Sequence, residues 1–266
     1  MNVFDLHNLS IGYTSKGERK SLFENIKLSV NKGEFVAVIG ANGIGKSTFL
    51  RTLSGFQNPL SGSVKLFGRE LLEYPKQELA LQLSVVLTEK VESKLIRVIE
   101  LLSIGRYPHI NWMGKLSAHD YDVIDEAMNI TGISLLAERS LFQLSDGELQ
   151  KVMIARALVQ ETPVIILDEP TSHLDLKNKA EVLSLLLHLC REHGKTILVA
   201  SHEIELALQL ADKIILMGFD HYFFSGTPQE VISQNLLKKL FADKEELIRY
   251  DQEAGKFIFN LRNVIR

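Results

Sequence analysis

The sequence predicts an α/β fold with a mostly parallel sheet, an antiparallel β-subdomain at the N-terminus and an inserted helical subdomain. Three observations support this prediction. Short apolar runs alternate with helical patterns, a glycine-rich loop joins a strand pattern to a helix pattern, and strand patterns stop in a central region. Apolar runs without alternation are typical of parallel strands that are covered on both faces.

The N-terminal part of the chain has the pattern of paired strands. Leu6–Tyr13 alternates like a strand, Thr14–Lys20 is predicted as a polar turn, and Ser21–Val30 is predicted as a second strand. Asn31–Gly33 is a tight turn before the apolar run that ends at Ile39. This succession of strands and turns predicts the antiparallel β-subdomain.

The later elements follow in order, with a change of pattern in the middle. Strands are predicted at 63–67, 84–87, 164–167, 196–200 and 213–217, and helices at 49–53, 78–82, 179–191 and 203–210. Helical periodicity at 98–104 and 121–128, interrupted at Arg106–Trp112, indicates the inserted helical subdomain. Helical segments follow Thr227-Pro228 as far as Lys244, and a hairpin is expected at 246–250 and 256–261.

Composition excludes several kinds of protein. The chain has 266 residues, of which 45% are hydrophobic and 24% charged, as in ordinary soluble globular proteins. A net charge of −3 and a pI near 6.3 argue against nucleic acid as the main partner. The single cysteine, Cys190, excludes an intrachain disulfide and a cysteine-based metal site. We find neither a secretion signal nor an apolar stretch of about 20 residues, so we expect a cytoplasmic protein.

The most informative stretch is a glycine-rich loop with the pattern G-x-x-x-x-G-K-[ST]. It comprises Gly40, Ala41, Asn42, Gly43, Ile44, Gly45, Lys46, Ser47 and Thr48. Glycines let the backbone turn sharply so that its N–H groups converge on phosphate oxygens, and a helix N-terminus adds positive charge. Lys46 would reach the β- and γ-phosphates, and the Ser47 hydroxyl would bind Mg²⁺. The pattern predicts a nucleoside triphosphate site; the alternative is a glycine-rich turn with a surface lysine.

Candidate catalytic side chains follow two other predicted strands. Asp168 and Glu169 come at the end of an apolar strand, where one carboxylate would hold Mg²⁺ and the next would orient the attacking water or take its proton. His202 follows a second apolar strand, on the edge of the sheet where ligands bind. Tyr13 could stack on a purine. The alternatives are a solvated acidic turn, a structural histidine and a core tyrosine.

A serine and a glycine mark the start of another helix. In Leu144–Lys151, Ser145 is placed to cap the helix, whose first N–H groups would form an anion site. The spacing from Ser145 to Glu148 is also the common S-x-x-E signature of a capped helix. On these residues alone, an ordinary capped helix is the better interpretation.

Together these stretches resemble the ATP-binding cassette of ABC transporters. The resemblance runs from Leu6 to about Pro228 and contains the family's motifs in order: Walker A at Gly40–Ser47, the signature at Leu144–Glu148, Walker B at Val164–Asp168 with Glu169, the D-loop at Ser172–Asp175, and the switch histidine His202. Within the family, Asp168–Leu176 and Gly105–His109 resemble ATPase subunits of iron–siderophore, haem and vitamin B12 importers.

The resemblance implies a P-loop NTPase core with the ABC ATPase fold, and a dimer. Two copies would pair head to tail, with ATP between the phosphate loop of one copy and the signature of the other. Ser145 and Gly147 would touch the γ-phosphate in trans with Glu148 beside them, Asp175 would cross the interface, and Tyr13 would stack on adenine. A transmembrane permease would dock on the helical subdomain, and a periplasmic or surface substrate-binding protein would act indirectly. The protein would lie at the cytoplasmic face of the cell membrane.

Three acidic residues depart from the family's pattern. Glu89 stands where a glutamine usually senses Mg²⁺; its carboxylate can still bind the metal but adds negative charge. The signature usually reads LSGGQ, whereas Asp146 and Glu148 here bring carboxylates towards a polyphosphate. They should weaken binding unless they point away or pair with a cation. Lys151, three residues after Glu148, is the nearest candidate cation.

The sequence therefore predicts the ATPase subunit of an importer for an iron chelate, haem or cobalamin, with ATP and Mg²⁺ as its ligands. A transport ATPase with another cargo, such as an exporter, and a soluble cassette ATPase are the alternatives. The slightly acidic charge argues against work on ribosomes or DNA. We expect an ATPase domain at 1–241, a helical insert at about 90–160 within it, and a C-terminal extension at 242–266.

Overall fold

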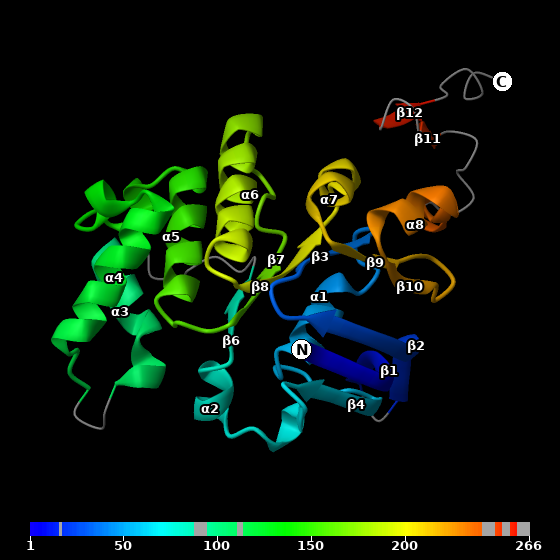
Figure 1. Cartoon of the computed structure of the whole chain (residues 1–266), viewed down its shortest axis with the longest axis horizontal. Helices are drawn as coiled ribbons and strands as arrows, with labels where there is room; N and C mark the ends of the chain where they lie inside the picture. Colours follow the sequence, from blue (N-terminus) through cyan, green and yellow to red (C-terminus); the bar gives the residue numbers. More distant parts are fainter. Residues whose placement is uncertain (16–17, 88–94, 111–113, 241–247, 252–255, 260–266) are drawn as a thin grey trace. The chain divides into compact units, whose positions relative to one another are not determined.

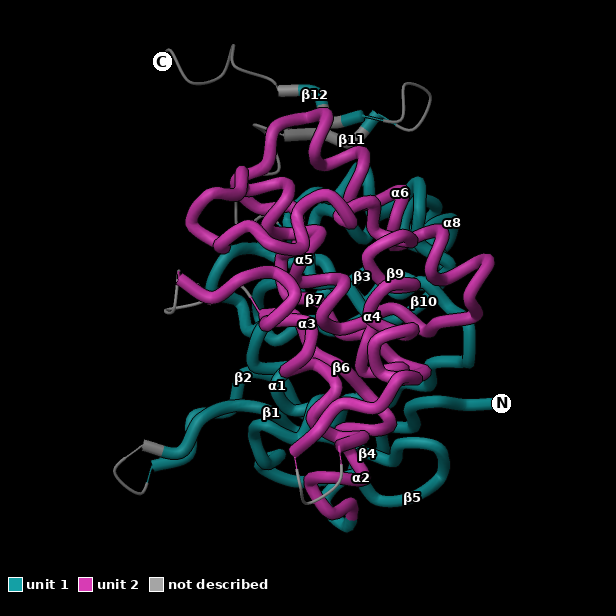
Figure 2. The backbone as a smooth tube through the Cα atoms, turned by 90° about the vertical axis from the view of Figure 1, so that its left-hand side faces the viewer, with its two compact units in different colours: residues 1–73, 198–266 teal, residues 74–197 magenta. Residues whose placement is uncertain are grey.

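The computed structural model describes the chain except residues 16–17, 88–94, 111–113, 241–247, 252–255 and 260–266. The chain divides into two compact units (Figure 2). The first, the discontinuous unit, comprises residues 1–73 and 198–266, and the second, the continuous unit, comprises residues 74–197.

The discontinuous unit contains the antiparallel β-subdomain that the sequence predicts (Figure 1). Its sheet has the order β2-β1-β4-β5 and is built from β1 (Asn2–Ser15), β2 (Glu18–Asn31), β4 (Ser61–Leu66) and β5 (Arg69–Glu70). Strand β1 is antiparallel to both β2 and β4, with Leu6 opposite Leu28 on one side and Val64 on the other. These three leucine and valine side chains are buried, which fixes the register of the sheet.

The polar turn predicted at Thr14–Lys20 is wrong at both of its ends. Strands β1 and β2 continue into it, and Thr14 pairs with Arg19 and Ser15 with Glu18. Residues 16–17 lie outside the described part of the chain. The side chains of Thr14, Glu18 and Arg19 are exposed, and a solvated hairpin keeps its backbone ladder without any apolar pattern.

A second sheet in the discontinuous unit leads into the phosphate loop. Strand β3 (Phe35–Gly40) lies between β9 (Lys213–Met217) and the last residues of β8 (Thr196–Ser201), and β10 (Phe223–Gly226) lies beyond β9. Strands β3 and β9 are parallel, and β10 is antiparallel to β9. The sequence analysis misses β10, because this short strand is half-buried along its whole length and shows no alternation.

The helices of this unit confirm most of the helical predictions. They are α1 (Lys46–Leu53), α7 (Ile204–Leu210), α8 (Pro228–Ser233) and a 3₁₀ helix at Leu236–Leu240. The helical prediction after Leu240 falls outside the described residues. The expected C-terminal hairpin is confirmed as the antiparallel pair β11 (Ile248–Asp251) and β12 (Lys256–Phe259).

The continuous unit contains both strands and helices. Strands β6 (Leu83–Val86) and β7 (Val164–Asp168) are parallel. The helices are α2 (Lys76–Ala80), α3 (Val98–Gly105), α4 (Ala118–Thr131), α5 (Asp146–Leu158) and α6 (Leu176–Arg191). Helices α3, α4 and α5 pack against one another, and α6 packs against α5 (Figure 1). The antiparallel first sheet and the parallel-rich second sheet confirm the predicted fold class.

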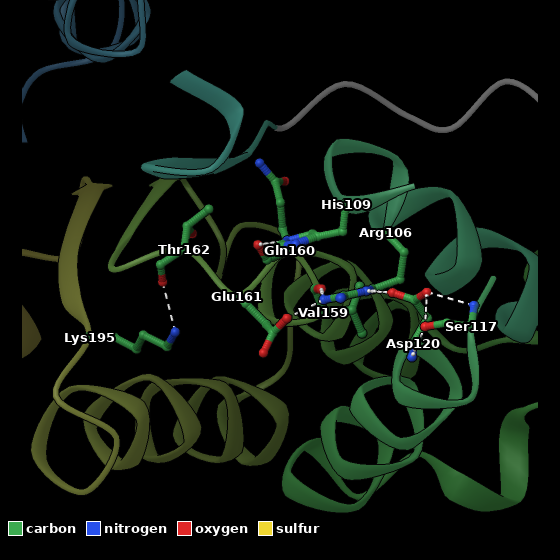
Figure 3. Close-up of polar contacts among 9 residues, drawn as sticks. All are labelled: Arg106, His109, Ser117, Asp120, Val159, Gln160, Glu161, Thr162 and Lys195. Carbon is green, nitrogen blue, oxygen red and sulfur yellow. Dashed lines mark hydrogen bonds and ion pairs between the residues drawn. The ribbon is translucent and has the colours of Figure 1, made fainter. Parts of the chain in front are cut away.

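A polar cluster around the buried Arg106 connects these helices to the segment that precedes β7 (Figure 3). The guanidinium of Arg106, which is 1% exposed, donates to Asp120 Oδ1 at 2.8 Å, and to the backbone oxygen of Val159 and to Glu161 Oε2 at 2.6 Å each. Asp120 also accepts hydrogen bonds from the backbone N–H and hydroxyl of Ser117, at 2.8 and 2.6 Å. We call these five residues the Arg106 cluster. It joins the end of α3 and the start of α4 to the segment between α5 and β7.

Among the described residues, no helix combines the length and the apolarity that crossing a membrane requires.

Candidate functional site

The phosphate loop connects β3 to α1 in the discontinuous unit. Its last glycine, Gly45, precedes α1 and has a φ of +122°, which L side chains rarely adopt. A Cβ there would also lie 3.0 Å from Leu22 Cδ1. Within the described part of the chain, no side chain caps the N-terminus of α1, and its first turn contains no acidic residue. The positive end of the helix is thus suited to an anion.

The amine of Lys46 is held against this loop. The residue is only 4% exposed, and its Nζ donates to the backbone oxygens of Gly40 at 3.0 Å and Ala41 at 3.2 Å. These two contacts hold the positively charged amine at the loop, where the oxygens of a phosphate anion would interact favourably with its charge.

Tyr13 and His202 belong to the same unit as the phosphate loop. The hydroxyl of Tyr13 forms a hydrogen bond with Thr48 Oγ1 in α1, while the tyrosine remains 50% exposed. Its ring is therefore available for stacking beside the helix that the loop begins. His202 is exposed and follows β8, the neighbour of β3 in the sheet. The strand that precedes His202 is thus adjacent to the strand that leads into the phosphate loop.

The two acids lie at the end of β7 in the continuous unit. All five residues of β7 are buried, including Asp168 at 6% exposure. Glu169 follows with a φ of +49°, which is uncommon for a residue other than glycine. Ser172 donates to the backbone oxygen of Glu169 from both its N–H and its hydroxyl, at 3.1 and 2.9 Å. This turn fixes the half-buried Glu169 next to the buried Asp168.

The signature serine forms a reciprocal cap at the start of α5. Ser145 donates to Glu148 Oε2 from its backbone N–H and from its hydroxyl, at 2.9 Å each, and its Oγ accepts from the Glu148 N–H at 3.3 Å. The backbone hydrogen bond, followed by the hydroxyl hydrogen bond, lowers the pKa of the Glu148 carboxyl below its usual value. The ordinary capped helix expected from local residues is therefore present.

Lys151, the cation expected to pair with Glu148, forms its short ion pair with Glu181 instead. Lys151 Nζ donates to Glu181 Oε2 on α6 at 2.5 Å, because the side of α5 that carries Lys151 packs against α6. The charge of Lys151 still helps to lower the pKa of Glu148, but the closer basic group is Arg139, whose Nη1 lies 3.9 Å from Glu148 Oε1.

The signature and the D-loop meet through a residue that the sequence analysis missed. A Cβ at the buried Gly147 would lie 2.4 Å from Asn178 Oδ1, so any larger residue there would displace the Asn178 side chain between α5 and α6. Asp175 caps α6 by accepting from the Asn178 backbone N–H at 2.8 Å and side-chain Nδ2 at 3.1 Å. The sequence motifs place Asp175 in the D-loop, but they predict neither this cap nor the contact of Asn178 with Gly147.

The predicted site residues thus fall into two groups, each within one unit. The discontinuous unit carries the phosphate loop, Tyr13 and His202, and the continuous unit carries Asp168 and Glu169 together with Ser145, Gly147, Glu148 and Asp175. Glu89 lies outside the described residues.

The chain resembles known proteins in both its sequence and its fold. A family model described as ABC transporter matches residues 23–172. An uncharacterised ABC transporter ATP-binding protein of Methanocaldococcus jannaschii is 39% identical over 91% of this chain and 84% of the relative. An achromobactin transport ATP-binding protein of Dickeya dadantii is 36% identical over 91% of this chain and 88% of its own length. The iron(3+)-hydroxamate import ATP-binding protein of Bacillus subtilis is 35% identical, with 93% and 91% coverage.

Solved structures agree with these relatives. An inward-facing transporter assigned to the metal-chelate ABC type has a chain that matches with a TM-score of 0.80 and 30% identity, covering 97% of this chain and 96% of that one. A dimeric ATP-binding cassette in a post-hydrolysis state, bound to ADP and phosphate, matches with a TM-score of 0.69 and 28% identity, covering 80% and 94%.

Proposed function

The chain is an ATP-binding subunit and ATPase of the ABC transporter family, and on that premise we propose that it powers the uptake of an iron chelate through a partner permease. The phosphate loop carries the ATPase part of the proposal: a helix N-terminus without acidic residues and a buried lysine amine suit a triphosphate. Tyr13 would stack on adenine.

Glu169 and His202 are the proposed catalytic side chains. Glu169 would orient the attacking water or take its proton, and the strained turn that fixes it supports a functional role. His202 would hydrogen-bond to the γ-phosphate or position the water. Both roles are carried over from the family resemblance.

The oxygen ligands on this chain fit Mg²⁺. The Ser47 hydroxyl and the buried Asp168 carboxylate are hard donors of the kind that Mg²⁺ prefers, and Glu89 is a further candidate. When bound, the metal would offset part of the negative charge of the triphosphate.

The second half of each ATP site would come from another copy of the chain. Ser145 and Gly147 would contact the γ-phosphate in trans, with Glu148 beside them and Asp175 crossing the interface. Their common location in one unit, where Gly147 and Asp175 both contact Asn178, supports a single surface that a partner could use. The dimeric ADP-bound cassette is a precedent for such pairing.

Import of an iron chelate is inferred from the relatives. Two of them are named for achromobactin and iron(3+)-hydroxamate, and a similar structure belongs to the metal-chelate type. Haem and cobalamin remain in the proposed cargo class. The chain would bind peripherally to its permease at the cytoplasmic face of the membrane, and a substrate-binding protein would deliver the cargo. We propose residues 1–241 as the ATPase domain, with a helical insert at about 90–160, and 242–266 as an extension.

Mg²⁺-dependent ATP hydrolysis tests the catalytic part. We expect Lys46→Ala to abolish activity, and Glu169→Gln to block hydrolysis while an ATP-bound dimer accumulates. Replacement of the exposed Lys32 by alanine is the matched control and should leave activity intact. A Glu169→Gln protein with wild-type turnover would remove Glu169 from the chemistry.

Reconstitution with the cognate permease and binding protein tests the cargo. Binding protein loaded with a ferric siderophore, haem or cobalamin should stimulate ATP hydrolysis with one of these three cargos. Stimulation by none of them, or outward movement of a substrate, would overturn the import proposal.

A further inference from the structure

The hydroxyl of Ser145 can donate one hydrogen bond, and in this structure it donates that bond to Glu148. The hydroxyl donates to Glu148 Oε2 at 2.9 Å, and the Ser145 backbone N–H donates to the same oxygen at 2.9 Å. A serine hydroxyl can donate only once at a time. A phosphate oxygen that is to receive this proton must therefore displace the carboxylate.

Glu148 meets Ser145 as an anion. Hydrogen bonds from the Ser145 backbone and hydroxyl lower the pKa of its carboxyl, and Arg139 and Lys151 contribute in the same direction. Its second oxygen lies 3.9 Å from Arg139 Nη1. Hydrogen bonds to charged acceptors are stronger than those to neutral ones, so the carboxylate competes well for the two Ser145 donors.

We propose that the Glu148 carboxylate competes with the terminal phosphate of ATP for the hydrogen-bond donors of Ser145. This competition raises the ATP concentration that the chain needs to dimerise. The inference rests on the proposed in-trans role of Ser145. Serine donors that are already bound to an anion must be released when the partner's ATP arrives. Glu148 acts through Ser145 and is thus a positioning residue, and it sets the ATP threshold of the dimer rather than the rate of the chemical step.

The chain offers two closely matched variants. Glu148→Gln keeps an oxygen for both Ser145 donors, because glutamine also completes this type of capping box, but it removes the charge. Asp146→Asn removes the same charge from the same turn of α5, at an exposed position that is not part of the cap. Comparing the two variants distinguishes competition for the Ser145 hydroxyl from general electrostatic repulsion between an acidic side chain and the triphosphate.

ATP-driven dimerisation in the Glu169→Gln background provides the test, measured by sedimentation at fixed protein concentration. We expect Glu148→Gln to lower the half-saturating ATP concentration about fivefold, as for a charged acceptor replaced by a neutral one. Asp146→Asn should shift it much less. The ATP affinity of the dilute monomer should be the same with and without the Glu148→Gln substitution, whereas the urea midpoint of unfolding should fall slightly, because the cap of α5 loses a charged acceptor.

Each other result overturns the inference. An unchanged half-saturation in Glu148→Gln, an equal shift in Asp146→Asn, or an equal shift in monomer affinity would show that Glu148 does not compete for Ser145. If the Glu169→Gln background fails to dimerise with ATP at all, the in-trans site itself is wrong. That failure is distinct from one in which the background dimerises and the Glu148→Gln variant behaves identically.

Discussion

Arg106 and Asp120 form a buried ion pair in the continuous unit, with 2.8 Å between Nε and Oδ1 (Figure 3). Their side chains are 2% and 8% exposed. Buried charges are tolerated only when they are paired and hydrogen-bonded, and Arg106 satisfies this through Asp120, Glu161 and a backbone oxygen. The pair joins the end of α3 to α4, and the contacts of Arg106 with Val159 and Glu161 connect both helices to the segment that precedes β7.

Replacing Asp120 with asparagine should destabilise the protein strongly. Among the described residues, the change leaves Arg106 with only the partly exposed Glu161 as an ion-pair partner, and breaking a buried pair costs about 3 kcal/mol. Urea unfolding of the full chain measures the loss. Glu161→Gln is the matched control at the same guanidinium, and because Glu161 is 41% exposed we expect a loss of about 1 kcal/mol or less. Equal losses in both variants would contradict the central role of the Asp120 pair.

The Asp120 carboxyl should also make the free energy of unfolding depend on pH in the acid range. Burial raises the pKa of Asp120, but hydrogen bonds from Ser117 and the charge and hydrogen bond of Arg106 outweigh burial and lower it from 3.8 to about 2. The folded carboxyl thus binds its proton less readily than the unfolded one. This stabilisation is fully present above about pH 4 and is lost as the pH falls towards about 2.

The difference in unfolding free energy between wild type and Asp120→Asn isolates this contribution. It should be constant above about pH 4.5 and shrink by about 2 kcal/mol as the pH approaches 2. Other carboxyls titrate alike in both proteins and cancel in the difference. A difference that does not change over this pH range would show that Asp120 titrates normally in the folded protein.

The Arg106 cluster marks what the sequence could not predict. Arg106–Trp112 is recognisable as a break between helices, but an arginine in such a break is normally expected at the surface. Its partners Asp120 and Glu161 lie 14 and 55 positions along the chain, and local patterns contain no information on that pairing. In contrast, β9 was predicted with its observed bounds, Lys213–Met217, because a short apolar run identifies a buried parallel strand by itself.

Gly147→Ala should destabilise the junction of α5 and α6. The added methyl group would lie 2.4 Å from Asn178 Oδ1 and 3.1 Å from its Cβ, and overpacking of this kind costs about 1–3 kcal/mol. Urea unfolding of Gly147→Ala measures it. Asn178→Ala removes the clashing oxygen, so the double variant should recover part of the loss. Additive losses would mean that the clash is absorbed elsewhere.

The two halves of the candidate site were predictable to different degrees. The phosphate loop is one short stretch of sequence, and the two acids at the end of β7 are neighbours in the chain. The chemistry of each could therefore be predicted from a short motif and the strand before it. The cap between Ser145 and Glu148 was also visible as a spacing. The contact of Gly147 with Asn178 depends on how two helices pack, and the partner of Lys151 was expected on its own helix, whereas it lies on α6.

Tyr13 provides a test of nucleotide binding that separates its ring from its hydroxyl. If the exposed ring stacks on adenine, Tyr13→Ala should raise the Kd for ATP about fivefold, since such contacts contribute about 1 kcal/mol. Tyr13→Phe loses only the hydrogen bond to Thr48 and should bind nearly as wild type does. Calorimetric titration with ATP measures both variants.

Inorganic triphosphate is the control ligand for Tyr13→Ala, because it has no base for the ring to stack on. It should bind to the variant and to the wild type with equal affinity. Equal weakening by the alanine and phenylalanine variants would assign the effect to the hydroxyl, which steadies α1 through Thr48, rather than to stacking. A loss of triphosphate binding in Tyr13→Ala would lead to the same conclusion, because the ring has no base to contact in that complex.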